Sequence, residues 1–465
     1  MARHVLVLAA GRGTRMKSDL PKVVHPVAGR PMLSWVLDAV DEVSAASVTV
    51  VVGHGADLVS EILPAGAGTA LQAEQLGTGH AALVGLEAVD WSPGDTVLVV
   101  YGDTPLLEGD TLERLAHRRE STGAAAVVLA ADAPDPTGYG RVLRRWDGTF
   151  DRIVEHRDAD EVALAVTEVN SGMYAFEAEF LAGALPALGT ANDQGEYYLP
   201  DVCNHRPDDV VVEAMPFEEM SGINTHVELA AVGDVLRRRI LDRWMLAGVR
   251  IDDPASTWVE SGVELAAGAH LAPGTHLRGS TRIGPGTRVG PDVWIEDCTV
   301  GADCLVWFSV LRGAVLGDGV EVGPYASLRP GSVLADGAKA GTFVETKNTE
   351  VGPGSKVPHL SYLGDATLGS GVNVGAGTIT CNYDGVDKHR TEIGDGVFIG
   401  SDTMLVAPVR LGNRSVTGAG STITRDVDDG ALAVERADQR EIPGYGDRLA
   451  ARKAEKRARR EEQEG

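Results

Sequence analysis

The sequence predicts an α/β domain with a Rossmann-like, mostly parallel sheet, followed by a linker helix and a parallel β-helix. Three observations support this order. Short strands rich in β-branched residues alternate with helix-like stretches up to about residue 226, a helix-initiation signal follows, and from residue 251 aliphatic residues recur every six positions. The hydrophobic period changes twice along the chain, so three different kinds of structure are expected.

Residues 1–226 contain apolar runs of strand length at 5–8, 48–52 and 97–100, with longer periodic segments between them. This alternation is typical of βαβ units with parallel strands. In such sheets, ligands bind beyond the carboxyl ends of the strands. We therefore expect residues 1–226 to form one α/β domain with its nucleotide site at that edge.

Residues 227–250 are predicted to form the linker helix. Thr225 and Glu228 have the spacing of a capping box, and Gly248 is in place to end the helix. Between them, apolar residues follow at helical spacing. They are Leu229, Val232, Leu236, Ile240 and Trp244.

A hexapeptide repeat occupies residues 251–436. Its aliphatic positions are Val259, Leu265, Leu271, Leu277, Ile283, Val289 and Ile295, then Val310, Leu316, Val322, Leu328 and Leu334, then Ile393, Ile399, Leu405 and Leu411. The spacing predicts a triangular β-helix, because each hexad can form one side with its aliphatic residue pointing inward. Three hexads, about 18 residues, then make one coil.

The repeat is interrupted around 341–350 and again between 380 and 393. We expect extra residues there to form loops, which on a solenoid usually carry function. Residues 437–465 are dense in Arg, Lys and Glu with few apolar anchors, which predicts a solvated helix or a disordered tail with no assigned role.

The composition argues against several classes of function. The chain has 465 residues, 43% of them hydrophobic, but no apolar run of about 18 residues that could span a bilayer. Its formal net charge of -25 repels nucleic acid and anionic membranes. Four cysteines form no C-x-x-C pair, which argues against a zinc site or disulfide framework and favours a reducing cytoplasm.

A glycine loop with Gly11 and Gly13 follows the first strand directly. Backbone N–H groups can approach a triphosphate there without a Cβ in the way. The stretch is also a cationic patch in an otherwise acidic chain. It contains Arg12, Arg15, Lys17 and Lys22 against the single acid Asp19.

This loop resembles the sugar-nucleotide pyrophosphorylase family through the motif L-A-A-G-x-G-T-R-M at residues 8–16, followed by Pro21 and Lys22. Residues 72–79 resemble the family's uracil-recognition segment, and 101–103 resemble its metal-binding strand end. The blocks at 137–141, 153–156, 170–172 and 195–199 resemble those that hold an N-acetylated sugar, and 222–224 completes the set.

The resemblance implies a nucleotidyltransferase that joins UTP to N-acetylglucosamine 1-phosphate with Mg²⁺. Asp103 and Asn224 would hold the metal, while Arg15 and Lys22 would neutralise charge on the leaving pyrophosphate. No protein nucleophile is required. The implied nucleotide and sugar-nucleotide contacts are Leu8, Ala9, Gly11, Gly13, Lys22, Gln72, Gly77, Thr78, Tyr101, Gly102, Asp103, Gly140, Glu155, Asn170 and Asn224.

A second group of polar residues lies in the repeat, where a bare β-helix needs none. The nearby run at 375–385, G-A-G-T-I-T-C-N-Y-D-G, resembles the family of bacterial bifunctional enzymes that acetylate glucosamine 1-phosphate and uridylylate N-acetylglucosamine 1-phosphate. Both domains resemble that family in order, over about residues 1–436. The resemblance implies a left-handed parallel β-helix with an acetyltransferase site.

An imidazole titrates near neutral pH, so His359 can accept the proton that the sugar amine loses, and the resemblance gives it the general-base role. The sugar phosphate would be bound by Arg329, Lys347, Tyr362, Asn373 and Lys388. Acetyl-CoA would be bound by Ala376, Asn382, Tyr383, Ser401, Ala419 and Arg436.

These groups would lie on successive faces of a convex prism, so a neighbouring chain is expected to close the site in a homotrimer. Glucosamine 1-phosphate, acetyl-CoA and UTP are the expected small-molecule partners. The product, UDP-N-acetylglucosamine, would feed peptidoglycan and lipopolysaccharide-type precursors.

Two other functions fit part of the pattern. A monofunctional pyrophosphorylase with a regulatory β-helix, as in relatives that make ADP-glucose, would not need His359 or the loop at 380–390. A non-enzymatic assembly subunit, as in translation exchange factors, would not need Lys22, Asp103 and Asn224.

Overall fold

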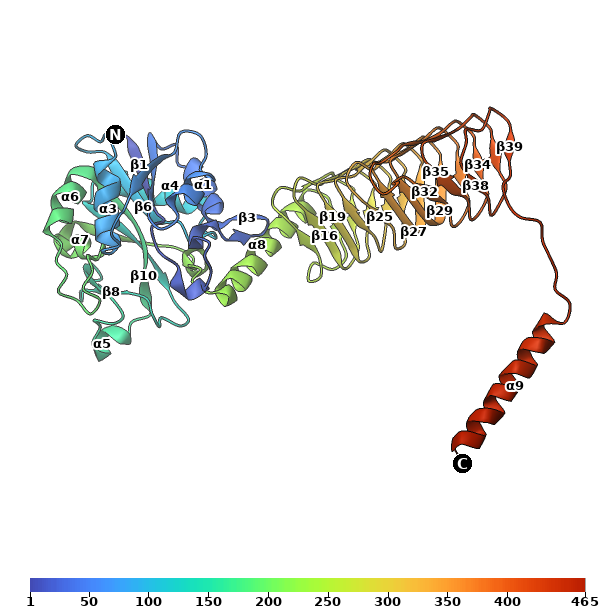
Figure 1. Ribbon diagram of the computed structural model, residues 1–465. Coiled ribbons are helices and arrows are strands. Elements are labelled where there is room, and N and C mark those ends of the chain that lie inside the picture. The colour runs from blue at the N-terminus through green and yellow to red at the C-terminus, as the bar shows by residue number, and fades with distance from the viewer. Residues whose placement is uncertain (465) are drawn as a thin grey trace. The chain divides into compact units, whose positions relative to one another are not determined.

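The computed structural model describes residues 1–464 as two compact units (Figure 1). The first comprises Met1–Glu264 with His276–Ser280, and the second comprises 265–275 with the chain from 281 onward. The four segments expected from the sequence, 1–226, 227–250, 251–436 and 437–465, remain a prediction. Within residues 1–464, none of the helices combines the length and the apolar character needed to cross a membrane.

The first unit is built on a mostly parallel sheet with strand order β11-β7-β10-β6-β1-β4-β5, to which the β8–β9 hairpin adds. Strand β10 runs antiparallel to both of its neighbours. The sheet strands are β1 (Arg3–Leu8), β4 (Ser47–Val52), β5 (Gly68–Leu71), β6 (Thr96–Tyr101), β7 (Ala126–Asp132), β8 (Arg141–Arg144), β9 (Phe150–Val154), β10 (Glu168–Glu177) and β11 (Val210–Ala214). The three strands predicted from the sequence are confirmed as β1, β4 and β6.

Helices cover both faces of this sheet because its central strands are apolar on both sides. Val5 and Val7 of β1 pack with α1 and α4, whereas Leu6 and Leu8 pack with α3 and α6. The helices are α1 (Met32–Asp41), α2 (Ala56–Ser60), α3 (Thr78–Glu87), α4 (Gly109–Thr122), α5 (Glu161–Leu164), α6 (Ala178–Ala184) and α7 (Asp201–Asn204).

Short elements complete this unit. They are the strands β2 (Pro26–Val27) and β3 (Arg30–Pro31) and the 3-10 helices η1 (Thr14–Met16), η2 (Lys22–Val24), η3 (Leu185–Ala187), η4 (Pro207–Asp209) and η5 (Phe217–Met220). Two of them, η1 and η2, follow the glycine loop and contain Arg15 and Lys22.

The predicted linker helix is α8 (His226–Leu246), and its capping box is confirmed. The Thr225 hydroxyl accepts a hydrogen bond from the Glu228 N–H at 3.2 Å, and the Glu228 carboxylate accepts one from the Thr225 N–H at 2.8 Å. Val232, Leu236 and Ile240 lie on its buried face, as their helical spacing predicts.

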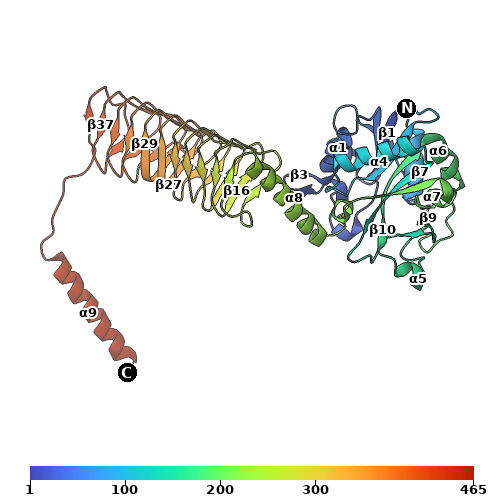
Figure 2. The same ribbon diagram turned by 180° about the vertical axis from the view of Figure 1, so that it is seen from behind.

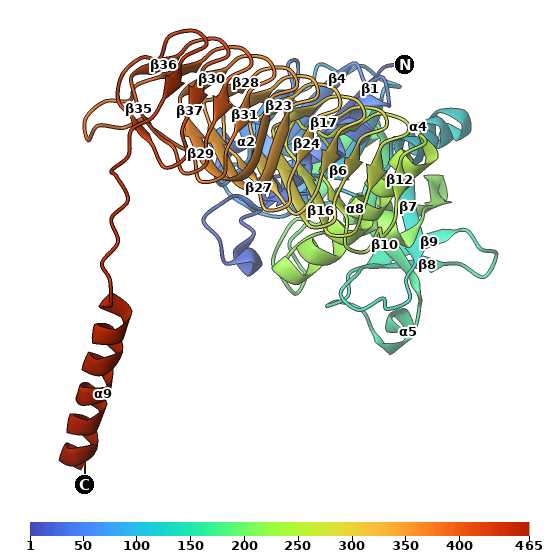
Figure 3. The same ribbon diagram turned by 90° about the vertical axis from the view of Figure 1, so that its right-hand side faces the viewer.

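The hexapeptide repeat forms a left-handed parallel β-helix (Figure 2). One side of its triangular coil is a nine-stranded sheet, labelled in part in Figure 3, which we call side C. Two further sides belong to a 19-stranded sheet. Side A contains the stacked positions Lys356, Asn373, Phe398 and Val416, and side B contains Tyr362, Ile379, Met404 and Thr422.

The strands of the 19-stranded sheet are β12 (Arg250–Ile251), β13 (Trp258–Val259), β15 (His270–Leu271), β16 (Thr275–Arg278), β18 (Arg288–Val289), β19 (Val293–Glu296), β21 (Leu305–Val306), β22 (Val310–Arg312), β24 (Glu321–Val322), β25 (Ser327–Leu328), β27 (Lys339–Lys347), β29 (Lys356–Gly364), β31 (Asn373–Val374), β32 (Ile379–Cys381), β34 (Phe398–Ile399), β35 (Met404–Val406), β37 (Val416–Thr417), β38 (Thr422–Ile423) and β39 (Leu432–Ala433). Side C contains β14 (Glu264–Leu265), β17 (Arg282–Ile283), β20 (Thr299–Val300), β23 (Val315–Leu316), β26 (Val333–Leu334), β28 (Glu350–Val351), β30 (Ala366–Leu368), β33 (Thr391–Ile393) and β36 (Val409–Leu411).

The aliphatic residues predicted to point inward are buried, with one exception. Val310 is 36% exposed, and Leu311 is the buried residue instead. The prediction for Val310 is wrong because one hexad is short there. Leu311 stacks on Ile295 and precedes the next inward residue, Leu316, by only five positions, so a spacing of six from Leu316 falls on the exposed Val310.

The first predicted interruption is also wrong. Residues 339–347 form one continuous strand, β27, and no loop is inserted. The coil is shorter rather than longer, since Lys339 pairs with Lys356 before three full hexads are complete. The second interruption is confirmed: Asn373 pairs with Phe398, well beyond three hexads, whereas Phe398 pairs with Val416 after three full hexads. We call residues 382–390 the insertion loop.

The charged C-terminal segment contains α9 (Tyr445–Glu464). Its side chains are exposed through residue 460, as the solvated helix predicted from the sequence requires.

Candidate active sites

The glycine loop lets the η2 segment approach the end of β1. Gly13 has φ +59°, and a Cβ on it would lie 2.7 Å from the Cβ of Lys22. Another residue at position 13 would therefore strain the backbone and push Lys22 away. The sequence brings Lys22 beside β1 through this glycine.

A cavity of about 270 Å³ opens at the carboxyl ends of β1 and β6. Its wall contains many of the residues predicted to bind nucleotide: Leu8, Ala9, Gly11, Lys22, Gln72, Gly77, Thr78, Tyr101 and Asp103. Ala10, Val23, Gln75, Ala81 and Glu196 also line it and were not predicted as site residues. Gln75 and Glu196 could have been found, because both stand inside motifs that carry the family resemblance.

Three polar side chains meet beside the glycine loop: Lys22, Asp103 and Asn224. The Lys22 ammonium contacts the Asp103 carboxylate and donates a hydrogen bond to Asn224 Oδ1 at 2.8 Å. Arg15 donates to the same Asn224 oxygen at 2.8 Å. A carboxylate and an amide oxygen thus share one cation, the Lys22 ammonium.

This donor set fits Mg²⁺. Mg²⁺ prefers oxygen ligands and usually takes only one or two from the protein, completing its shell with water and substrate phosphates. Among the described residues, no group of three or more His, Cys, Asp or Glu could hold a metal ion. Asp103 and Asn224 are the residues that would hold Mg²⁺ here, and this role stays a prediction.

Gln72 is buried and oriented by its neighbours. Its Nε2 donates to the Gly77 carbonyl at 3.2 Å and lies 3.0 Å from His80 Nδ1. Gly77 itself has φ +112°, and a Cβ on it would lie 2.5 Å from the Tyr197 carbonyl oxygen. The segment 72–79 can follow this path only with glycine at position 77.

Tyr101 lines the cavity, and Glu155, which follows β9, lies near its ring outside the cavity wall. A Cβ on Gly172, which has φ +79°, would lie 2.2 Å from the Tyr101 ring, so glycine leaves room for that ring. Burial raises the pKa of the Tyr101 hydroxyl well above its usual value, and the nearby charges of Glu155 and Asp103 raise it further. Burial, then Asp201 and Asp158, raise the pKa of Glu155.

Gly140 lies beside Glu155 and contacts Asn170. The Asn170 N–H donates to the Gly140 carbonyl at 2.8 Å, and a Cβ on Gly140 would lie 3.0 Å from Glu155 Oε1. These residues lie outside the wall of the cavity around Lys22, as do Gly13, Gly102 and Asn224.

On the β-helix, His359 lies on β29 at the corner between sides A and B. It is exposed and lines a cavity of about 360 Å³ together with Asn373 and Lys356 of side A. Below them, Lys339 and Glu321 line the same cavity and form an ion pair of 2.6 Å. The structure therefore groups His359 with only one of the predicted sugar-phosphate residues, Asn373.

The other sugar-phosphate residues gather at the far end of side B. Lys347 ends β27, and Lys388 reaches it from the insertion loop. The adjacent Lys388 ammonium, and then Arg329, lower the pKa of Lys347. Arg329 also forms an ion pair with Glu345 at 2.9 Å. Three cations thus stand together, which is what a phosphate group requires.

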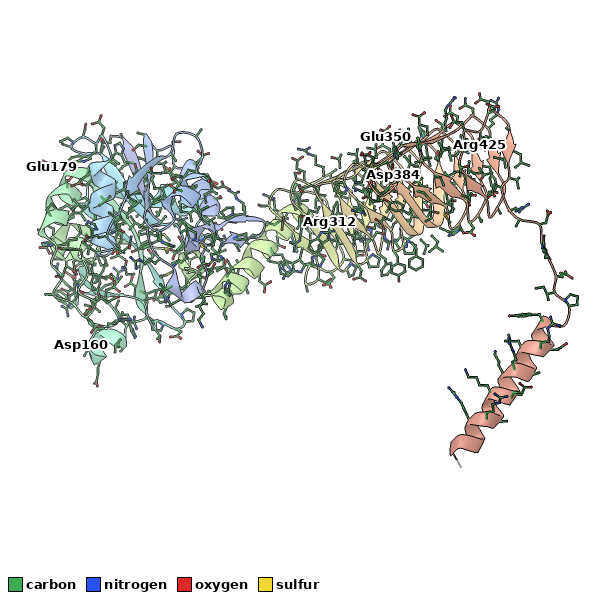
Figure 4. All side chains as sticks on the ribbon, in the orientation of Figure 1. Asp160, Glu179, Arg312, Glu350, Asp384 and Arg425 are labelled. Carbon is green, nitrogen blue, oxygen red and sulfur yellow. The ribbon has the colours of Figure 1, made fainter. Side chains whose placement is uncertain are left out.

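Tyr362 and Asn382 approach each other over Gly364. A Cβ at that position would lie 2.4 Å from the Tyr362 hydroxyl and 2.8 Å from Asn382 Nδ2. Asn382 begins the insertion loop, which also contains Asp384, labelled in Figure 4. Asp384 accepts a hydrogen bond from His389 at 2.8 Å. Tyr383 is 61% exposed and donates its hydroxyl to the Gly385 carbonyl at 2.7 Å.

The remaining acetyl-CoA residues form a ladder along the corner between sides A and B. Successive corners are joined by backbone hydrogen bonds from Gly377 to Leu360, Asp402 to Ala376, and Gly420 to Ser401. Arg436 closes the series by donating to the Ala419 carbonyl at 3.1 Å. Ala376, Ser401 and Ala419 thus make a track of small side chains that begins beside His359.

The predicted acetyltransferase residues therefore fall into two groups. The His359 group contains His359, Asn373 and the corner ladder, and the Lys347 group contains Arg329, Lys347, Tyr362, Asn382 and Lys388. Tyr383 stands apart, exposed in the insertion loop. Within residues 1–464, the described hydrogen bonds and ion pairs do not join a side chain of one group to a side chain of the other.

Two family models match the chain, one in each of its two compact units. Residues 5–194 match the family model of the MobA-like NTP transferase domain, and residues 390–425 match that of the bacterial transferase hexapeptide, six repeats.

Curated relatives resemble the chain over nearly its whole length. The bifunctional protein GlmU of Syntrophomonas wolfei is 46% identical over 96% of this chain and 100% of its own length. Proteins of the same name from Pelobacter propionicus and Streptomyces avermitilis are 49% and 48% identical, over 96% and 99% of this chain and 98% of each relative.

Proposed function

Because the chain belongs to the family of the bifunctional GlmU proteins, we propose that it makes UDP-N-acetylglucosamine by two reactions at two sites. The β-helix site acetylates glucosamine 1-phosphate with acetyl-CoA. The α/β site then transfers a uridylyl group from UTP to N-acetylglucosamine 1-phosphate and releases pyrophosphate.

In the α/β site, the main obstacle is repulsion between two anionic substrates. The backbone of the glycine loop receives the triphosphate, and Arg15 and Lys22 neutralise the pyrophosphate as it leaves. Gln72 orients the uracil through its amide, while Glu155 and Asn170 accept and donate hydrogen bonds to the N-acetylated sugar. The sugar phosphate itself attacks the α-phosphorus, so no protein nucleophile is needed.

Asp103 and Asn224 would hold Mg²⁺, which would offset the negative charge of the substrate phosphates. The contact of both oxygens with the Lys22 ammonium supports this assignment.

In the β-helix site, the cations of the Lys347 group bind the phosphate of glucosamine 1-phosphate. His359 accepts the proton that the amine loses as its nitrogen attacks the thioester carbonyl, and coenzyme A leaves. The track of small side chains at Ala376, Ser401 and Ala419 leaves room for the cofactor beside His359, and Arg436 is placed to pair with one of its phosphates.

A homotrimer completes this site by bringing side A of one chain against side B of the next. The separation of the His359 and Lys347 groups on neighbouring sides supports this assembly. The exposed apolar corner residues Tyr325, Phe343 and Leu360, each more than half exposed, would be covered in such a contact. Four unpaired thiols agree with a cytoplasmic enzyme that supplies cell-wall precursors.

One observation carries the bifunctional proposal: a cationic subsite and an exposed histidine occupy neighbouring sides of the β-helix, where a purely regulatory β-helix would need neither. The purified chain should therefore convert glucosamine 1-phosphate, acetyl-CoA, UTP and Mg²⁺ into UDP-N-acetylglucosamine. Uridylyl transfer without acetylation would instead identify a monofunctional pyrophosphorylase, and no turnover would identify an assembly subunit.

A further inference from the structure

Asp365 connects the strand that carries Lys347 with both ends of the insertion loop, although no sequence motif singles it out. Its carboxylate accepts hydrogen bonds from Asn348 Nδ2 at 2.6 Å and from Asn382 Nδ2. Its N–H donates to the Lys347 carbonyl at 3.0 Å, and its carbonyl accepts from the Thr391 N–H at 3.1 Å. Asn382 and Thr391 border the two ends of the insertion loop, so this one residue ties both ends to the strand that carries Lys347.

The carboxylate is also the counter-charge of the cluster. Partial burial favours its neutral form, but hydrogen bonds from Asn348 and Asn382 and the charges of Lys388 and Lys347 prevail and lower the pKa of Asp365. It is therefore ionised at neutral pH. The charge of Asp365 also raises the pKa of Lys347, and so opposes the lowering caused by Lys388 and Arg329. Among the described ion pairs of these three cations, the one other acid is Glu345, which pairs with Arg329.

We propose that Asp365 is a positioning residue for acetyl transfer, which holds the insertion loop so that Lys388 meets Lys347 at the phosphate subsite and Asn382 stays ordered beside Tyr362. This inference rests on the proposed assignment of that subsite to glucosamine 1-phosphate.

Two opposing effects determine its influence on binding. A carboxylate repels a phosphate, but without it the two ammonium groups repel each other and the loop that carries Lys388 loses both anchors. The cluster keeps a net positive charge, with three cations against Asp365 and Glu345, so it still attracts phosphate. The cations are already held together before the phosphate binds, so binding does not have to order them. We expect this gain in phosphate affinity to exceed the loss caused by repulsion from the carboxylate.

The substitution Asp365→Asn tests this balance. Asparagine tolerates the φ of +50° found at Asp365 and keeps its shape, but it removes the charge and one acceptor. We expect the KM for glucosamine 1-phosphate to rise about tenfold, as for a lost charge-assisted contact, with a much smaller change in kcat. The alkaline limb of kcat/KM should also move to lower pH, because Lys347 loses the charge that favours its protonated form.

Asp387→Asn is the matched control. It removes one negative charge from the insertion loop next to Lys388. Unlike the Asp365 carboxylate, that of Asp387 accepts no hydrogen bond from Asn348 or Asn382 in the described structure. The KM and the pH profile of this variant should stay close to those of the unmodified protein. An equal effect of both substitutions would mean that only the local charge matters and would overturn the positioning role.

Folding is checked by thermal unfolding and by uridylyl transfer from N-acetylglucosamine 1-phosphate, which should not change. Asn348→Gly gives a second variant, which loosens the carboxylate without removing its charge and tolerates the φ of +45° at this position. It should raise the KM for glucosamine 1-phosphate and leave the alkaline limb in place. If Asp365→Asn leaves both KM and pH profile unchanged, or tightens binding of the sugar phosphate, the inference is wrong.

Lys347→Ala separates this inference from the proposed function. If it leaves the KM for glucosamine 1-phosphate unchanged, the assignment of the phosphate subsite itself fails. If Lys347→Ala raises that KM but Asp365→Asn does not, the subsite stands and only the role of Asp365 is rejected.

Discussion

At the residue scale, Lys22 holds two polar side chains of the α/β site together. Its ammonium holds the Asp103 carboxylate and the Asn224 amide oxygen together before any substrate binds. Without a cation between them, the carboxylate and the amide oxygen would give up contacts with water and gain no partner in return. The arrangement keeps both oxygens in place at the edge of the sheet, and it identifies Asp103 as the residue whose loss should matter most.

We predict that Asp103→Ala lowers uridylyl transfer by about a hundredfold or more, because the substitution removes electrostatic stabilisation between two anionic substrates. Initial rates with UTP, Mg²⁺ and N-acetylglucosamine 1-phosphate measure this. Acetyl transfer to glucosamine 1-phosphate, assayed separately in the same preparation, should stay within about twofold, since the ligands of that site lie on the β-helix. Loss of both activities in folded protein would contradict the assignment.

His359→Ala should have the reciprocal effect. Removing a general base typically costs roughly 10²- to 10⁴-fold, so acetyl transfer should fall by that amount while the cations of the Lys347 group still bind the sugar phosphate. Supplying N-acetylglucosamine 1-phosphate directly should give normal uridylyl transfer. An unchanged acetylation rate in this variant would exclude His359 as the base.

The sequence predicts some of these residues better than others. Motif residues such as Gln72 and Asp103 could be placed in the cavity because their resemblance is local in the chain. Asp365 could not, since its role depends on Asn348 and Asn382, which lie in the preceding and following coils, and only the coil register brings them together. A contact that arises from stacking has no local signature.

At the scale of elements, the start of α8 is coupled to the α/β site. The Glu228 carboxylate accepts hydrogen bonds from the N–H groups of Asn224 at 2.6 Å and Thr225 at 2.8 Å. The capping box thus fixes the backbone of the residue that contacts Lys22. A helix-initiation signal read from the sequence proves to orient a predicted metal ligand.

We predict that Glu228→Ala lowers stability by about 0.5–2 kcal/mol, as for other lost caps, and raises the Mg²⁺ concentration that gives half-maximal uridylyl transfer. Glu228→Gln is the matched control, because glutamine keeps an oxygen that can accept both hydrogen bonds. Thermal unfolding and a Mg²⁺ titration measure the two effects. Equal Mg²⁺ dependence in the alanine variant and the unmodified protein would show that the cap serves stability alone.

The β-helix shows which elements periodicity can predict. Inward positions such as Ile283 and Leu405 follow from a strict six-residue spacing. Leu311 does not, because coils shorter than three full hexads shift the phase without any change in composition. For the same reason, the spacing predicts an insertion at residues 341–350, although strand β27 continues without interruption to Lys347. Hexad spacing identifies the fold, but the length of each coil is set by corner packing.

At the scale of the whole molecule, the proposed acetyl site would be completed by the proposed trimer. The His359 group occupies side A and its corner with side B, whereas the Lys347 group occupies the far end of side B. A parallel three-fold arrangement of prisms sets one side of each chain against a different side of the next. Each site would then take its base from one chain and its phosphate-binding cations from another.

This arrangement predicts that two inactive variants restore activity when they share a trimer. His359→Ala supplies intact cations, and Lys388→Ala supplies an intact base. In trimers assembled at random from equal amounts, about a quarter of the sites would combine an intact base with intact cations, so about a quarter of the normal acetyl transfer should return. Co-expression with two affinity tags, tandem purification and light scattering would establish that the variants are mixed. Separately purified trimers, combined without exchange of chains, are the control and should stay inactive. If each site lies within one chain, the mixed trimers should show no more acetylation than the two variants alone, because no site would then contain both parts.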